Sequence, residues 1–485
     1  MLLERFNAAG WEQWDVPRLP AIPDGMPILV DDDLLFADGV SRRPATVVNR
    51  WLRDLPNNKV ASAGSWWAYG RAVKAWMEHL HVHGIELFDT RVRLKDALST
   101  YAAFHESGPI GERWQATYWN QQVSILSGFY QWAVAEAGVS AVPFTYKQAT
   151  AAFGGTKTTV MTNLATRRVG KPHVTVRYLE PEFEDLFLKG LGGLGPDGAA
   201  DMNFHGRELS RNGAGGALAL GTGMRRREFS MLLVYELPAL PRRPTEVPIE
   251  FPVPAPLAKG RKFRRTWITF EDLERVHGHV RLDRQMTGVG STWTPPRSWG
   301  EPLHVTEPDV RGGRVNGTRV LWGALTPAER MRLVAPEGGS CLLWLKSRGA
   351  PFTAWSTVFE RTSQRIAKRW DPRFPHVYPH RCRHTFAMRT LEKLARGYYA
   401  SAAQLGSGDA DAVWLHFLTA NEPLLILRDL LGHSSVLTTE MYVKRLDVSR
   451  IYKQAYASSY EARASSHQLT KAEIEVEAEF KEEGD

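Results

Sequence analysis

The stretch that decides the fold runs from Leu427 to Tyr442 and reads L-R-D-L-L-G-H-S-S-V-L-T-T-E-M-Y. Its first residues are typical of the end of an apolar helix, and Gly432-His433 predicts a tight turn. A second helix should follow, because the hydroxyl of Ser434 or Ser435 can accept a hydrogen bond from a free backbone N–H. Tyr442 then lies about two turns into that helix.

A second dense stretch precedes it, from His380 to Thr385, and reads H-R-C-R-H-T. If it is helical, spacings of three and four residues put His380, Arg383 and His384 on one face. Cys382 points away from that face and should belong to the core. A histidine and an arginine that converge beside a tyrosine fit a site where a phosphate comes under attack.

The totals set the class of protein. A chain of 485 residues is too long for one core, so two or three domains are expected. With 43% hydrophobic and 24% charged residues it is a globular protein, and its net charge of +8 favours a polyanionic partner. Two cysteines, Cys341 and Cys382, make neither a disulfide framework nor a zinc cluster, which favours the cytoplasm. No apolar run approaches the roughly 20 residues that span a bilayer, so no membrane partner is expected.

Residues 1–141 are expected to form a small helical domain. Residues 1 to about 40 look like an irregular lead-in. Apolar residues then recur at helical spacing from Trp66 to Leu80, and further helices are expected over 94–105 and 117–137. The tryptophans fall on the buried period, so they should pack in the core.

Residues 142–175 are expected to be an extended basic linker. Gly154-Gly155 interrupts the pattern, threonines are scattered through it, and it carries Arg167, Arg168 and Lys171. Such a segment either follows a DNA backbone or is a solvated tether, and the sequence leaves both open.

A second domain is expected over 176–455. Residues 217–233 predict two helices with a break at Thr222-Gly223. The prolines of 237–257 predict little regular strand, and a turn at 259–262 should precede a strand at 265–270. Residues 280–320 are read as an insertion, either a long loop or a small β unit, and 355–369 as a helix. The fold class is therefore mainly α with a small β-sheet (α+β).

Residues 456–485 are expected to form a C-terminal tail. Within it, glutamates alternate with apolar residues over 473–480. That period of two fits a strand that adds to the edge of a sheet.

Three motifs together resemble the tyrosine recombinase (phage integrase) family. They are T-G-M-R-R-R-E at 222–228, H-R-C-R-H-T at 380–385, and L-G-H-S-S at 431–435 followed by Tyr442. Each is weak alone, but their order and the nine-residue gap from His433 to Tyr442 make the resemblance specific. It covers roughly 176–450, and the helical domain before it is similar to the family's core-binding domain in kind and position.

Phosphodiester cleavage by a side chain explains these residue types. Tyr442 would attack the phosphate, and the guanidinium forks of Arg225 and Arg383 would hold its non-bridging oxygens. His380 would exchange a proton with Tyr442 or bind the phosphate, and His433 would donate another hydrogen bond. No cluster of metal ligands appears, and neither a metal nor a cofactor is expected.

The remaining polar residues receive supporting roles. By resemblance, Lys259 would be the general acid for the leaving 5′ oxygen, with Lys262 as the alternative. Glu228 is expected to support an arginine, and His384 to be structural rather than catalytic. Arg226 and Arg227 are expected to contact DNA phosphates or to be solvated, and Lys262 is also a candidate for a DNA contact.

The resemblance implies a site-specific recombinase acting on double-stranded DNA. Its partners would be three further copies in a tetramer on two DNA sites, and possible accessory or sister recombinases. The tail at 473–480 is a hypothetical element exchanged between subunits. The alternatives are a type IB topoisomerase, which shares the chemistry, and a DNA-binding protein without catalysis.

Overall fold

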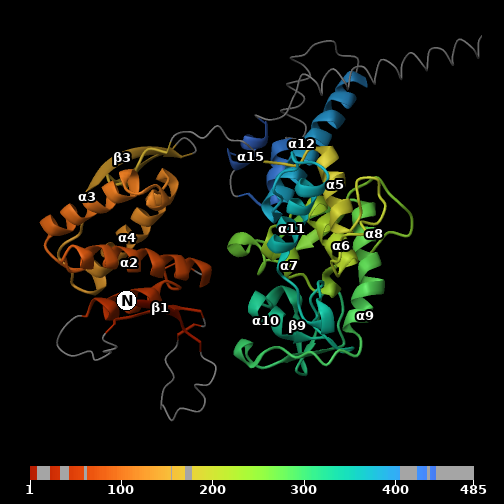
Figure 1. Cartoon of the computed structure of the whole chain (residues 1–485), viewed down its shortest axis with the longest axis horizontal. Coiled ribbons are helices and arrows are strands. Elements are labelled where there is room, and N and C mark those ends of the chain that lie inside the picture. The colour runs from red at the N-terminus through yellow and green to blue at the C-terminus, as the bar shows by residue number, and fades with distance from the viewer. Residues whose placement is uncertain are drawn as a thin grey trace, which may run out of the picture. The chain divides into compact units, whose positions relative to one another are not determined.

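The computed structural model describes residues 1–7, 22–23, 25–32, 43–58, 60, 63–153, 156–169, 177–404, 423–433 and 437–443. The chain divides into two compact units, Met1–His173 and Val174–Asp485. In Figure 1 the first unit runs from red to orange and the second from yellow to blue. The predicted class, mainly α with small β-sheets, is confirmed. No helix among the described residues is long and apolar enough to cross a membrane.

Unit 1 is built mainly of helices whose aromatic faces meet in one core. They are α1 (Pro44–Asp54), α2 (Ala63–Val82), α3 (Arg91–Ser107) and α4 (Ala116–Glu136). Trp66, Trp76 and Trp119 are buried, as their spacing predicted. The indole N–H of Trp76 donates to the Tyr130 hydroxyl at 3.0 Å, so burial does not leave that polar group without a partner.

The expectation of an irregular stretch over residues 1–40 is wrong at two places. Strand β1 (Leu2–Arg5) pairs antiparallel with β2 (Pro27–Val30). The Asn49 side chain of α1 bonds both the N–H and the C=O of Leu29, each at 2.8 Å. Strands of four residues are too short for a period to be recognised, and their pairing depends on a partner more than 20 residues away in the chain.

Residues 142–175 are not simply an extended linker. Strand β3 (Tyr146–Phe153) and strand β4 (Thr156–Asn163) pair in register along their whole length, with Phe153 opposite Thr156. The β-branched threonines of these segments favour strands. The Tyr146 hydroxyl lies 2.7 Å from that of Ser127, which anchors the base of the hairpin to α4.

Unit 2 has a helical core with two small sheets. The helices are α5 (Pro181–Leu191), α6 (Leu209–Thr222), α7 (Arg226–Ser230), α8 (Phe270–His279), α9 (Gln285–Gly288), α10 (Pro327–Arg332), α11 (Trp355–Arg369), α12 (Pro379–Gln404), α14 (Pro423–Leu431) and α15 (Leu437–Val443). The break between α6 and α7 and the helix at 355–369 are as predicted. Cys382 is fully buried in the core, also as predicted.

The prediction of little strand over 237–257 is wrong. Strand β5 (Ile249–Val253) pairs antiparallel with β6 (Arg264–Ile268), and Pro252 lies opposite Arg265. Proline cannot donate to a ladder, but a two-stranded sheet has free edges where that loss is tolerated. The turn between these strands contains a short 3₁₀ helix, Lys259–Arg261.

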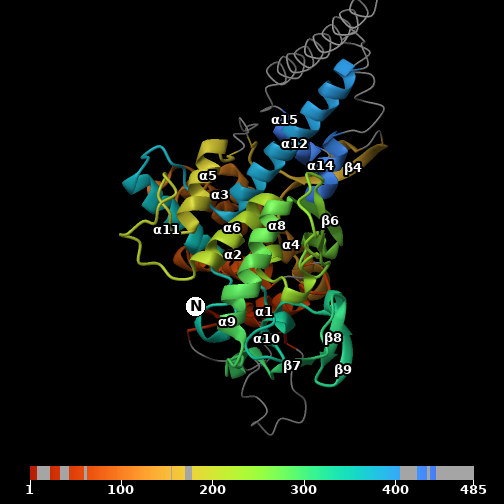
Figure 2. The same ribbon diagram turned by 90° about the vertical axis from the view of Figure 1, so that its right-hand side faces the viewer.

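Residues 280–320, predicted to be an inserted loop or β unit, begin with helix, Val280–Arg284 followed by α9, and then form most of a small sheet. This sheet has the order β10-β7-β8-β9, formed by Leu333–Val334, Leu303–Thr306, Gly312–Val315 and Thr318–Leu321. Figures 1 and 2 show this sheet at the end of unit 2 opposite to α12, α14 and α15. The buried Arg330 joins it to the core, donating to Glu236 at 2.6 and 2.8 Å and to the Met231 carbonyl.

Replacing Arg330 by methionine should therefore destabilise unit 2. Methionine fills much of the space but leaves the Glu236 carboxylate buried without its partner, which typically costs about 3–5 kcal/mol. Urea unfolding followed by tryptophan fluorescence measures the loss. The control is Arg314→Met, which removes an exposed pair with Glu307 and should cost less than about 1 kcal/mol. Equal losses in the two variants would contradict the role given to Arg330.

Candidate active site

Arg225 is positioned by the break between α6 and α7. Gly223 ends α6 with a φ of 60°, and a Cβ there would lie 2.4 Å from a ring carbon of Phe386. Both the backbone conformation and the contact therefore require glycine. The chain then extends through Arg225, the N-cap of α7, whose side chain is 25% exposed.

A buried carboxylate holds Arg225 in place. Glu228 accepts from the Arg225 backbone N–H at 2.7 Å and from its Nη1 at 2.9 Å. Arg264 donates to both oxygens of the same carboxylate, at 2.9 and 2.7 Å. Burial raises the pKa of Glu228, but the hydrogen bonds and charges of Arg264 and Arg225 outweigh it and lower the pKa overall. The predicted supporting role of Glu228 is confirmed.

Arg264 is a site residue that the sequence reasoning missed. Its Nε donates to the Leu430 carbonyl at 3.0 Å, so it links Glu228 to the end of α14. The strand β6 buries Arg264, Thr266 and Ile268 on one face. That alternation places an arginine at an inward position, which is the pattern that would have identified it.

Arg383 connects the ends of two helices. It lies on α12, is 1% exposed, and donates from Nη1 to the Gly223 carbonyl at 2.8 Å and from Nη2 to the Leu431 carbonyl. Burial, followed by the charges of Arg225 and Arg264, lowers the pKa of Arg383 to about 9. These contacts use two of the five N–H groups that a guanidinium carries, which leaves donors for a ligand.

His433 follows the predicted turn. Gly432 has a φ of 63°, and a Cβ there would lie 2.6 Å from Cδ of Arg264. The His433 Nδ1 is 3.0 Å from the Thr439 hydroxyl of α15. Burial, then Arg383, Arg225, His380 and His384, lower the pKa of His433 to about 4, so the ring is neutral at pH 7. Ser434 and Ser435, the predicted caps, lie outside the described residues.

Tyr442 meets a different histidine from the one expected. Its side chain is 1% exposed, and its hydroxyl lies 2.9 Å from Nδ1 of His384. His380, at the start of α12, contacts the His384 ring at a centroid distance of 4.5 Å. Burial raises the pKa of Tyr442 to about 12, while Arg383 and Arg225 act in the opposite direction. The effect of Arg383 and Arg225 on the pKa of Tyr442 reflects their proximity to its hydroxyl.

The two candidate lysines make no hydrogen bond or ion pair with this cluster among the described residues. Lys259 and Lys262 are both exposed in the turn between β5 and β6. Among the contacts of the described residues, none joins either lysine to Arg225, Arg383 or Tyr442. The choice between Lys259 and Lys262 stays open.

The basic residues suggested for DNA contacts differ in their surroundings. Arg226, Arg227 and Arg168 are exposed. Arg167 is tied to its own unit, with Nη2 2.7 Å from the Ala102 carbonyl and its guanidinium 4.4 Å from the centre of the Trp119 ring. Lys171 lies outside the described residues.

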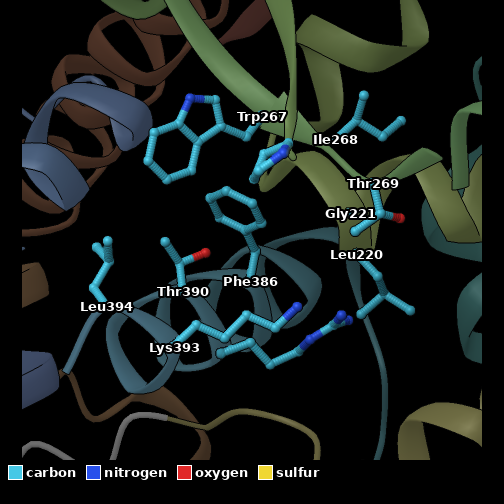
Figure 3. A pocket seen from close by; sticks show the side chains of 11 residues that line it. Leu220, Gly221, Trp267, Ile268, Thr269, Phe386, Thr390, Lys393 and Leu394 are labelled. Carbon is cyan, nitrogen blue, oxygen red and sulfur yellow. The ribbon is translucent and has the colours of Figure 1, made fainter. Parts of the chain in front are cut away.

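A separate cavity of about 190 Å³ is lined by parts of α6, β6 and α12. Figure 3 shows Phe386 directed toward Trp267 across it, with Thr390, Lys393 and Leu394 farther along α12. None of the candidate catalytic residues lines this cavity. Within the part of the chain that the structure describes, no group of three or more His, Cys, Asp or Glu could hold a metal ion.

No protein-family model and no curated protein matches this sequence. Solved structures with a similar fold include the XerH site-specific recombinase bound to palindromic difH substrate, with a TM-score of 0.46, 14% identity, and coverage of 86% of this chain and 85% of that chain. The Tn1549 transposon integrase in complex with circular intermediate DNA has a TM-score of 0.43 and 14% identity, covering 82% and 94%. These proteins are of the class that the sequence motifs resemble.

The Arg264–Glu228 contact predicts a contrast between neighbouring arginines. Arg264→Lys should lower the free energy of unfolding by about 3 kcal/mol, because an ammonium cannot replace the fork that bonds Glu228 and Leu430. Arg265→Lys should change it by less than about 1 kcal/mol, since Arg265 forms an exposed pair with Glu250. Urea unfolding at pH 7 compares the two, and equal losses would show that the buried contact does not stabilise the site.

Proposed function

We propose that this chain is a site-specific DNA recombinase of the tyrosine type, which cuts and rejoins DNA through a phosphotyrosyl intermediate. The observation that supports it is the convergence of Arg225, Arg383, His433 and a buried Tyr442 from segments far apart in the sequence. Two guanidinium groups beside a hydroxyl nucleophile suit a phosphodiester under attack.

The proposed chemistry assigns each group a role. The Tyr442 oxygen attacks phosphorus, and Arg225 and Arg383 hold the two non-bridging oxygens as charge builds on them. His433 and His380 add hydrogen bonds to the phosphate. The tyrosyl ester conserves the energy of the broken bond, so religation needs neither ATP nor a metal. Loss of one arginine donor should cost about 3 kcal/mol, or roughly 100-fold in rate.

Double-stranded DNA is the proposed partner of both units. The exposed Arg226 and Arg227, next to Arg225, are proposed to bind phosphates on either side of the cut, and Arg168 to bind them from unit 1. Arg167 is a weaker candidate because its guanidinium is already engaged within unit 1. The proposed assembly is a tetramer of this chain on two DNA sites, in which sister recombinases could take part. The tail at 473–480, suggested as the exchanged element, lies outside the described residues.

A type IB topoisomerase would use the same chemistry on a single duplex. The two functions differ in what the DNA must contain. A recombinase exchanges strands only between two specific sites, whereas a topoisomerase relaxes any supercoiled plasmid. Joined products from a pair of labelled sites favour the recombinase, and relaxation of a plasmid without such sites favours the topoisomerase.

Tyr442→Phe should abolish the covalent protein–DNA adduct. The substrate is the DNA that flanks the gene in its source, nicked near the cut so that the intermediate is trapped. A denaturing gel should show an adduct for the wild-type protein and none for the variant, because phenylalanine has no nucleophile. Tyr118→Phe, an exposed position of unit 1, is the control and should keep the adduct.

Two outcomes would contradict the proposed nucleophile. An adduct that persists in Tyr442→Phe would assign the attack to another side chain. DNA binding without any adduct, even for the wild-type protein, would favour the DNA-binding protein without catalysis.

A DNA substrate with sulfur in place of the leaving 5′ oxygen tests whether Lys259 or Lys262 is the general acid. Lys259→Ala should slow cleavage of normal DNA roughly 100-fold or more, which is typical for loss of a general acid. With the 5′-bridging phosphorothiolate its rate should return close to that of the wild-type protein, because a thiolate leaves without a proton. Lys262→Ala should show a smaller loss that sulfur does not restore. If the two variants exchange these behaviours, Lys262 is the acid.

A further inference from the structure

His384 lies directly against the atom that would react. Its Nδ1 is 2.9 Å from the Tyr442 hydroxyl, and the two ring centroids are 5.8 Å apart. Among the hydrogen bonds of the described residues, this is the one in which the Tyr442 hydroxyl takes part. His433 uses its own Nδ1 on Thr439, and the contact shown for His380 is with the His384 ring.

We propose that His384, rather than His380, accepts the proton of the Tyr442 hydroxyl as its oxygen attacks the DNA phosphate. This inference rests on the proposed function, because it takes Tyr442 to be the nucleophile. It gives a catalytic role to a residue whose position in the sequence suggested only structural support. His380 is then free to act on the phosphate.

The direction of the hydrogen bond follows from the two protonation states. Burial, then His380, Arg383 and Arg381, lower the pKa of His384 to about 4, and burial raises the pKa of Tyr442 to about 12. At pH 7 both groups are therefore neutral. A phenol O–H is the stronger donor, so Nδ1 accepts and the ring carries its proton on Nε2.

The same charges explain why the proton would stay on Tyr442 until DNA binds. The cations that depress the pKa of His384 include Arg383 and Arg381, and Arg225 acts on the adjoining His380 and His433. A phosphodiester held between Arg225 and Arg383 brings a negative charge that offsets them. The basicity of His384 should then rise when the substrate is in place.

The proposed step is balanced. The Tyr442 O–H bond breaks and its proton moves to Nδ1 of His384 while the Tyr442 oxygen bonds to phosphorus. The bond from phosphorus to the 5′ oxygen breaks, and that oxygen takes a proton from the general acid. Religation runs the same transfers in reverse, with His384 returning its proton to Tyr442.

His384→Asn tests the proton transfer while preserving the contact. The asparagine amide oxygen occupies a position close to that of Nδ1, so it accepts a hydrogen bond but not a proton. Single-turnover adduct formation on the nicked DNA should slow about 100-fold or more at pH 7, with DNA binding unchanged. Between pH 7 and 9 the rate should rise about tenfold per pH unit, because tyrosinate must form without a base.

Comparison variants make the result specific. The wild-type protein should show a flat profile over that pH range, and His376→Asn, an exposed histidine before α12, should match it. His380→Gln should lose rate without acquiring the slope. Should His384→Asn not bind DNA, His384→Gln is measured in the same way.

Two results would overturn the proposal. One is a rate for His384→Asn within about threefold of the wild-type rate, and the other is a slow rate whose pH profile stays flat, which would make His384 a positioning residue only. Failure of the proposed function looks different, because the wild-type protein would then form no adduct, or Tyr442→Phe would keep one, whatever residue stands at 384.

Discussion

The buried Glu228 carboxylate is the contact on which the rest of the site depends. It is fully buried, so its negative charge is tolerated only because Arg225 and Arg264 surround it. The same carboxylate also accepts from the Arg225 backbone N–H at the first turn of α7. Glu228 therefore fixes both the backbone and the side chain of Arg225. Arg264 extends the contact to Leu430, so one ion network joins α7, β6 and α14.

Two glycines allow these elements to approach. Gly223 and Gly432 both adopt positive φ, and a side chain at either would collide, with Phe386 in one case and Arg264 in the other. Arg383 then bonds the Gly223 and Leu431 carbonyls, which lie at the ends of α6 and α14. Close packing therefore explains the glycines of the T-G and L-G motifs. The polar residues next to them, Arg225 and His433, are held in place by that packing.

The motifs predicted the local geometry of their own segments, because each one is local. Spacings along α12 and around the 432–433 turn are set by helix and turn geometry, and these predicted the face that carries His380, Arg383 and His384. What failed depended on partners distant in the chain. Pro252 obscured β5 because its pairing with β6 is not visible in either segment alone, and the pairing of β3 with β4 was hidden within a segment read as basic and polar.

Arg264 and His384 show the same limit at the level of side chains. Arg264 was one of several basic residues around the 259–262 turn until its strand fixed which face it occupies. His384 stands next to Arg383 in the sequence, but only the packing of α15 against α12 brings it to Tyr442. A motif identifies residue types and intervals, whereas the contact between two motifs is a property of the fold.

The balance of charges in the described site suggests why Tyr442 would stay protonated until DNA binds. The guanidinium groups of Arg225, Arg264 and Arg383 surround the single carboxylate of Glu228, so positive charge is in excess. The histidines cannot relieve it. Burial, then His380, Arg383 and Arg381, keep the pKa of His384 at about 4, and burial, then Arg383 and Arg225, do the same for His433. The excess is already in place before any ligand arrives. If a phosphodiester binds here as proposed, it would meet an organised positive environment whose cost was met during folding. Tyr442 lies within that environment, with its protonated hydroxyl hydrogen-bonded to His384. The arrival of a negative charge is the change that would let it lose its proton.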